Sequence, residues 1–393
     1  MDAVNFLPAV VALIIAFMTS VLLTKRFGSP SDQGRFSSID GLRGYLAFFV
    51  FLHHSCIWYF YLRTGRWELP PSNIYTHFGQ SAVALFFMIT GFLFFSKIID
   101  GRTKNVDWTK LFISRILRLA PLYFFMVLIL FLIIAIISKG ILNEPAPVLF
   151  KNLIRWLGFT ILGAPQINGI KNTSQIVAGV TWSLPFEWFF YLSLPLMALT
   201  LRVKPPIAYV ALAVFSLLYF EYWRPSIYYL AFLGGIIASF LARSSRFSTF
   251  ATKKASSFVV IGCIGVVVGV FPSAYAVIPL SLLAVAFALV ASGNDLFGIL
   301  AASASRTLGE LAYSIYLLHG IFLFTTFTYA LGIPASANLS PLSHWFIVFG
   351  MTPVLIFFCF LTFRFIERPA MQSTNSVTVW IRSNVLNRSK NST

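Results

Sequence analysis

An aspartate, an arginine and two histidines, Asp40, Arg43, His53 and His54, lie in the apolar stretch SIDGLRGYLAFFVFLHHSC at residues 38–56. Placing an ionisable group within a bilayer costs about 2.5–3.5 kcal/mol on insertion scales, so such residues are candidates for function. The separation of Arg43 and His54 on an α-helix is three turns plus roughly 20°, so both side chains lie on one face about 16 Å apart. His53 points roughly 80° away from Arg43. We therefore interpret Arg43 and His54 as a pair, and His53 as a contact to a neighbouring helix.

The Arg43–His54 pair suits a ligand with phosphates at one end and a reactive group at the other. Arginine binds phosphate through charge-assisted, often bidentate hydrogen bonds. A buried imidazole tends to be neutral and able to accept a proton. Acyl-coenzyme A, with its long pantetheine arm, has this shape. The alternative is structural: Arg43 would reach lipid headgroups, and His54 would make a hydrogen bond in helix packing.

Charged residues also interrupt two later apolar segments. Arg115 and Arg118, one turn apart in SRILRLAPLYFF, could extend a phosphate site or could anchor a helix at the cytoplasmic face. Glu187 lies among aromatic residues in TWSLPFEWFFYLSLPL. It could orient a sugar hydroxyl or a catalytic histidine, and Trp182 could stack on a sugar ring. The alternative is an interfacial aromatic belt with one buried ion pair.

Two further patterns occur near the C-terminus. Tyr313, Tyr316 and His319 form a polar stripe at i, i+3 and i+6 in LGELAYSIYLLHGIF, which could line a cavity that binds substrate or could bond a neighbouring helix. Arg364 and Glu367 are expected to form a local ion pair. The five histidines lack metal-ligand spacing, so no metal site is expected, and no catalytic triad, P-loop or dinucleotide fingerprint occurs.

The composition indicates an all-α integral membrane protein. Of its 393 residues, 58% are hydrophobic and only 10% are charged, against about 25% charged in soluble domains. The net charge of +17 does not indicate nucleic acid, because the basic residues cluster at the ends of apolar segments. Three cysteines lie inside apolar runs without pairing or metal spacing and are interpreted as small core residues.

The apolar segments predict about eleven transmembrane helices. With the N-terminus outside and the C-terminus in the cytoplasm, 22 of the 29 Lys and Arg residues lie on the inner side, as the positive-inside rule requires. The segments lie near 5–24, 42–62, 77–98, 120–138, 182–200, 206–221, 227–242, 257–272, 275–293, 311–332 and 344–366.

Some local features are also predicted. The segment VLFKNLIRWLGFTIL at 148–162 could lie along the membrane surface. The polar residues 371–393 are expected to be a mobile cytoplasmic tail. GGIIA at 234–238 and GVVVG at 265–269 have the small-xxx-small spacing of helix-packing seams. The N-terminal apolar stretch lacks a leading basic region, so residues 1–30 are interpreted as a retained spanning helix.

Six motifs in order resemble the membrane-bound acyltransferase-3 family, which contains O-antigen and Nod-factor acetyltransferases. The resemblance covers about residues 36–370, and Thr90 stands where the family usually has serine. The motifs are SIDGLRGYLAFFVFLHH, ALFFMITGFLF, SRILRLAPLYF, TWSLPFEWFFY, LAYSIYLLH and FRFIERP.

The resemblance implies a ten-helix core, to which residues 1–30 add one helix. It implies transfer of an acyl group, usually acetyl from acetyl-CoA, to a sugar or another small acceptor. The family's R-x10-H pair matches Arg43 and His54, its arginines match Arg115 and Arg118, and its glutamate matches Glu187. The fused SGNH domain of many relatives is expected to be absent.

The sequence thus predicts an O-acetyltransferase of the bacterial inner membrane, with acetyl-CoA as donor substrate and no bound cofactor. Its acceptor would be a hydroxyl of a lipid-linked or cell-surface saccharide such as O-antigen. Arg43, Arg115 and Arg118 would bind the donor, His54 and Glu187 would be catalytic, and Trp182, Tyr313 and His319 would contact substrate. His54 would act as general base or be transiently acylated. The alternatives are a transporter or flippase, which would have repeats and broken helices, or acylation of a small molecule.

Overall fold

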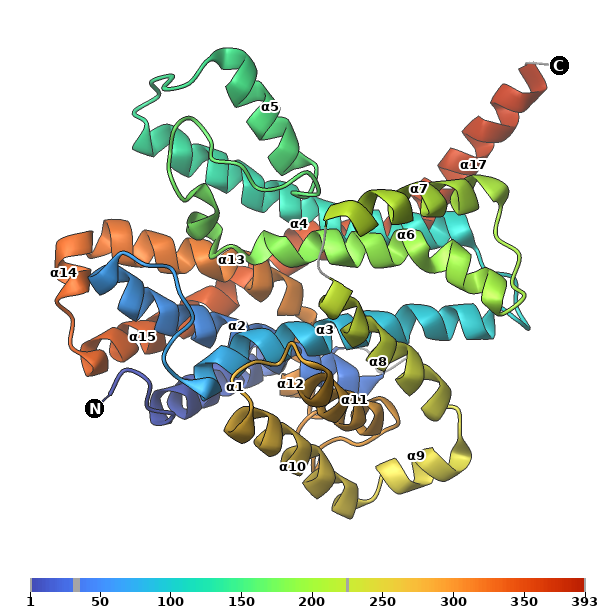
Figure 1. Cartoon of the computed structure of the whole chain (residues 1–393), viewed down its shortest axis with the longest axis horizontal. Helices are drawn as coiled ribbons and strands as arrows, with labels where there is room; N and C mark the ends of the chain where they lie inside the picture. Colours follow the sequence, from blue (N-terminus) through green and yellow to red (C-terminus); the bar gives the residue numbers. More distant parts are fainter. Residues whose placement is uncertain (1, 31–35, 224–225, 392–393) are drawn as a thin grey trace.

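The computed structural model describes residues 2–30, 36–223 and 226–391, with backbone alone at 220–223, 226 and 385–391. Within this part of the chain the secondary structure is helical and no strand forms, which confirms the all-α prediction. Figure 1 shows the helices gathered around α2 and α3, with the N-terminal helix α1 along one side and α17 projecting at the C-terminal end.

Each of the eleven predicted segments lies in a helix, although the observed bounds differ by up to twelve residues, the largest shift being at the start of α4. The shifts follow from caps and turns that hydropathy alone does not locate, such as Asp107, whose carboxylate accepts from the Lys110 N–H at the start of α4. The main helices are α1 (Leu7–Phe27), α2 (Ser37–Thr64), α3 (Asn73–Asp100), α4 (Trp108–Ile137), α6 (Leu184–Thr200), α7 (Ile207–Trp223), α8 (Tyr229–Leu241), α10 (Lys254–Val270), α11 (Val277–Ala291), α13 (Ala312–Thr325) and α15 (Pro341–Thr362).

Among the described residues, five helices are long and apolar enough to cross a membrane, or up to seven if each bent pair forms one span. One bent pair joins α8 to α9 (Ser245–Ala251) at 108°, and the other joins α12 (Ser303–Glu310) to the helix beginning at Ala312 at 62°. Helices α7, α10 and α11 are apolar but shorter. The chain is therefore a multi-pass membrane protein, and the count of eleven spans stays a prediction.

Helices α3 and α8 pack backbone against backbone through glycine. A methyl group on Gly235 would lie 2.0 Å from the Met88 carbonyl oxygen, and one on Gly91 would lie 2.4 Å from that of Phe232. The GGIIA seam is thus confirmed. The GVVVG prediction is wrong, because a methyl group added to Gly265 or Gly269 on α10 would meet nothing within 4 Å among the described residues.

The N-terminal helix α1 packs against α12 and α15 through its small residues, while its large apolar residues face outward. Ala12 and Ala16 are fully buried, whereas Ile14, Met18 and Leu22 are more than half exposed. Outward apolar residues are expected where lipid replaces water.

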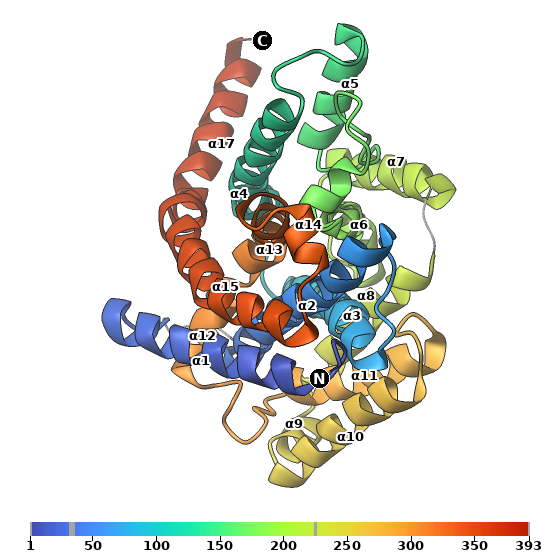
Figure 2. The ribbon, with the colours of Figure 1, turned by 90° about the vertical axis from the view of Figure 1, so that its left-hand side faces the viewer.

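Two peripheral segments differ from their predictions or refine them. The predicted surface segment forms α5 (Ala146–Leu157), whose Phe150 and Ile154 are exposed. Residues Thr374–Asn391, expected to be a mobile tail, form helix α17 against α4. Arg382 on α17 pairs with Asp107 at 2.5 Å, an anchor that the tail's polar composition does not reveal. Figure 2 shows α17 continuing beyond α15 along the side of the molecule.

Three other predictions concern single residues. Cys56 and Cys359 are free and buried, as expected, and Cys263 is free and half-buried. The predicted Arg364–Glu367 ion pair is wrong. Glu367 is 2% exposed and accepts a hydrogen bond from Ser314, while the Arg364 guanidinium lies over the Phe27 ring at 5.5 Å. The two residues belong to a π-helical turn, η5 (Phe363–Glu367), whose geometry turns their side chains to different sides.

Candidate active site

A cavity of about 200 Å³ lies between α2, α3, α4, α6 and α13. It brings together six candidate site residues that the sequence singled out from four separate segments. They are Arg43 of α2, Arg115 and Arg118 of α4, Glu187 of α6, and Tyr313 and Tyr316 of α13. The rest of the wall is mainly apolar and comes from α3, with Val83, Phe86, Phe87, Ile89, Leu93 and Phe94.

The charges in this cavity are unequal, with three guanidinium groups and one carboxylate. Arg43 has a weak contact with Asp40, at 3.9 Å. Arg115 lies over the Phe94 ring at 4.7 Å, and Arg118 contacts the Met371 sulfur at 3.5 Å. Within the described chain, neither Arg115 nor Arg118 has a carboxylate within ion-pair distance. A partly apolar cavity with more cations than counter-charges favours an anionic ligand, and arginine favours phosphate or carboxylate.

Glu187 lies in the cavity. It does not orient His54, which was one of the two roles that the sequence suggested for it. The Glu187 carboxylate accepts a short hydrogen bond from the Tyr191 hydroxyl, one turn along α6. Tyr191 also lines the cavity; it belongs to the aromatic residues noted around Glu187, but its hydrogen bond to that carboxylate was not predicted. The i, i+4 spacing of a carboxylate and a phenol on one helix was the available signal.

His54 is instead paired with His319, on α13. The His319 Nε2 lies 3.0 Å from the His54 Nδ1. The His319 Nδ1 lies 2.8 Å from the Ile315 carbonyl, and a carbonyl only accepts, so Nδ1 of His319 carries the proton. In a neutral His319 the Nε2 then accepts from His54 Nδ1–H, a proton shared with the Val50 carbonyl at 3.0 Å. This leaves the His54 Nε2 as an unprotonated base.

His53 has a different environment. Its Nδ1 donates to the Tyr75 carbonyl at 2.7 Å, and its ring packs where Gly79 leaves room on α3. The prediction that His53 contacts a neighbouring helix is confirmed.

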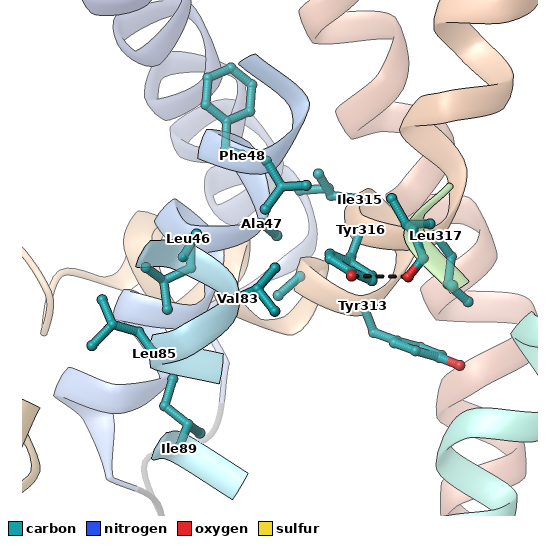
Figure 3. Packing of buried hydrophobic residues seen from close by; sticks show 14 of the residues in the cluster. Leu46, Ala47, Phe48, Val83, Leu85, Ile89, Tyr313, Ile315, Tyr316 and Leu317 are labelled. Atoms are coloured by element: carbon teal, nitrogen blue, oxygen red, sulfur yellow. Dashed lines mark hydrogen bonds between the residues drawn. The ribbon is translucent and has the colours of Figure 1, made fainter. Parts of the chain in front are cut away.

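Neither His54 nor His319 lines the arginine cavity, but Tyr316 connects the two places. Tyr316 lines the cavity, and its ring centroid lies 6.4 Å from that of His319 on the next turn of α13. Its hydroxyl lies 2.8 Å from the Ser183 hydroxyl and donates to the Val180 carbonyl at 3.0 Å. Figure 3 shows Tyr316 and Tyr313 leaving α13 beside Val83 of α3.

The aromatic stripe on α13 fits both readings left open by the sequence. Tyr313 lines the cavity and also donates to the Leu119 carbonyl of α4 at 2.9 Å.

The structure does not bring Trp182 to the cavity wall. Trp182 is half-buried among other rings, with Tyr228 at 5.1 Å and Phe186 at 5.9 Å between centroids.

The helical membrane architecture and the arginine cavity beside a histidine pair fit a membrane enzyme that binds an anionic substrate. A comparison with protein-family models matches residues 36–364 to the Acyl_transf_3 acyltransferase domain. The chain therefore belongs to the membrane-bound acyltransferase-3 family. Comparisons with curated proteins and with solved structures give no match. Helix α1 precedes the matched region, and every residue of the candidate site lies within it.

Proposed function

We propose that this acyltransferase moves an acetyl group from cytoplasmic acetyl-CoA to a hydroxyl of a lipid-linked or cell-surface saccharide. The observation that carries the proposal is the convergence of Arg43, Arg115 and Arg118 in one cavity whose wall leads, through Tyr316, to the His54–His319 pair. A phosphate-binding end and a base at the other end match the two ends of an acyl-CoA.

The size of the cavity supports binding of the thioester arm. At about 200 Å³ it is smaller than the roughly 300–1,000 Å³ typical of drug-sized ligands. The narrow pantetheine chain is therefore the part that enters, and the phosphates stay at the mouth beside the arginines. Arg43 and His54 are separated by about 16 Å along α2, a distance that an extended pantetheine arm spans.

In the proposed reaction, the acceptor hydroxyl oxygen attacks the thioester carbonyl carbon. The C–O bond forms, the C–S bond breaks, and the hydroxyl proton moves to Nε2 of His54. The imidazolium then returns this proton to the departing thiolate, so that CoA leaves as the thiol. In the alternative route, the lone pair of the His54 Nε2 attacks the thioester first and the imidazole is transiently acylated. Ping-pong kinetics would identify that route, and a ternary-complex pattern would support His54 as general base.

Replacing His54 by alanine tests the assignment. His54→Ala is expected to lower acetyl transfer and acceptor-independent thioester hydrolysis by at least about 10²-fold, because both need the base. The measurement is release of CoA from labelled acetyl-CoA by the full chain in detergent. His53→Asn is the control, since an asparagine amide can still donate to the Tyr75 carbonyl.

Near-normal turnover by a folded His54→Ala variant would remove the mechanism. Binding of acetyl-CoA without any turnover by the unmodified protein would contradict the whole proposal and would favour a transport role.

A further inference from the structure

A second cavity, of about 260 Å³, lies on the other side of the histidine pair. Three helices give the same order. Along α2, Arg43 lines the arginine cavity, His54 belongs to the histidine pair, and Trp58 and Tyr61 line the second cavity. Along α13 the corresponding order is Tyr316, His319 and Phe324, and along α4 it is Arg118 and then Ile137.

The wall of this second cavity contains a buried hydrogen-bond donor that has no partner among the described residues. Trp58 is 2% exposed, and its indole Nε1 makes no hydrogen bond with any described residue. A buried polar group without a partner is rare and needs an explanation. Trp58 lines the cavity, so this donor lies in the wall beside the space that a ligand would fill.

Polar side chains of the segment before α6 also line this cavity. Lys171, Asn172 and Gln175 line the cavity, and their side chains make no hydrogen bond or ion pair with the described residues. Lys171 and Asn172 are exposed, so the cavity opens to the surface, while Gln175 is half-buried. The cavity therefore combines indole and phenol rings with amide and ammonium groups, in a lining whose other side chains are mainly apolar.

Trp67 links this cavity to the proposed base. Its ring stacks on the His54 ring at 6.2 Å between centroids, and it lies 5.8 Å from the Trp58 ring and 5.3 Å from the Tyr61 ring. The cavity thus lies one aromatic ring away from His54, on the side opposite to the arginines.

We propose that the cavity lined by Trp58, Tyr61, Lys171, Asn172 and Gln175 is the acceptor site and binds a polyhydroxylated saccharide. The inference rests on the proposed acetyl transfer and names where its acceptor is held. Aromatic faces pack against the apolar faces of sugar rings, and amides both donate to and accept from neighbouring hydroxyls. Lys171 disfavours a cationic amine acceptor, because like charges repel.

The test compares acetyl transfer with acetyl-CoA hydrolysis in the full chain in nanodiscs. Acceptors are the methyl α-glycosides of glucose, galactose, mannose and rhamnose, and the donor is labelled acetyl-CoA. We expect Trp58→Phe and Gln175→Ala to raise the KM for the glycosides at least tenfold, with the KM for acetyl-CoA and the rate of hydrolysis within twofold of the unmodified protein. Gln175 is preferred to Asn172, because Asn172 has a left-handed φ of 58° that alanine tolerates poorly.

Each variant has a matched control. Trp188→Phe removes an indole Nε1 that is also buried without a partner among the described residues but lies outside both cavities. Gln166→Ala removes an exposed glutamine of the same segment that does not line the cavity. Both are expected to keep the KM for the glycosides within twofold. Size-exclusion profiles establish that each variant is folded.

Three outcomes separate this inference from the proposed function. Equal losses in the Gln175→Ala and Gln166→Ala variants would overturn the acceptor site. Hydrolysis without saturable transfer to any glycoside would overturn it as well and would leave the donor site standing. Absence of both hydrolysis and transfer in the unmodified protein would contradict the proposed acetyltransferase itself.

Discussion

The chemistry of His54 depends on a residue far away in the chain. His319 accepts from the His54 Nδ1–H at 3.0 Å and is itself fixed by its bond to the Ile315 carbonyl. This arrangement sets the tautomer of His54, leaves its Nε2 free and fixes the plane of the ring. In the proposed reaction His319 is thus a positioning residue, whereas the sequence had suggested that it contacts substrate.

Replacing His319 by alanine is expected to lower kcat on the order of 10²-fold with little change in the KM for acetyl-CoA, because the base loses its orientation and the arginines are untouched. The loss is partial, since the Val50 carbonyl still accepts from His54 Nδ1–H. His319→Gln is expected to recover part of kcat, because its amide oxygen can accept in place of Nε2. Steady-state kinetics measure the split. A rise in KM without loss of kcat would mean that His319 binds substrate directly.

Sequence reasoning located residues well when they share a helix and poorly when they do not. The helical repeat placed Arg43 and His54 on one face and separated His53 from them. It could not place His319 beside His54, because nothing in either segment states which helices are neighbours. Trp58 was missed for another reason: a tryptophan in an apolar helix is typical of a membrane-interface belt, and only the structure shows that its indole Nε1 has no partner among the described residues.

At the scale of helices, α3 is the element that positions the site. Its residues 83–94 form most of the apolar wall of the arginine cavity, and its opposite side packs on α8 through Gly91 and Gly235. GGIIA and GVVVG are equivalent patterns in the sequence. They differ in the structure because α8 has a close neighbour and α10 at Gly265 has none within the described chain, so the pattern alone could not decide between a seam and a lipid-facing surface.

These two glycines form a matched test of the packing. Gly235→Ala places a methyl group 2.0 Å from a backbone oxygen and is expected to destabilise the protein by about 1–3 kcal/mol. Gly265→Ala meets nothing within 4 Å and is expected to be neutral or to stabilise α10 by roughly 0.5–1 kcal/mol. Thermal unfolding in detergent measures both. Equal Tm values for the two variants would show that the seam between α3 and α8 contributes little to stability.

At the scale of the whole molecule, the order of the two cavities and the distribution of basic residues predict the same orientation in the membrane. Helices α2, α4 and α13 all run from the arginine cavity towards the proposed acceptor cavity. The positive-inside rule independently predicts that the first residues of these helices lie in the cytoplasm, on the side of the proposed donor. The number of spans does not follow from the sequence in the same way, because short helices and bends of 62° and 108° have the same hydropathy as straight spans.

Orientation can be tested across one helix, without knowing the total number of spans. Lys104 lies before α4, and Gln166 lies after α5, which follows α4. Both side chains are exposed. In a background with the native cysteines replaced by serine, Gln166→Cys is expected to react with a membrane-impermeant maleimide in intact spheroplasts, and Lys104→Cys only after permeabilisation. Labelling of both in intact spheroplasts would mean that α4 does not span. The reverse pattern would place the arginines on the outer side, away from the cytoplasmic acetyl-CoA pool, and would contradict the proposed donor site.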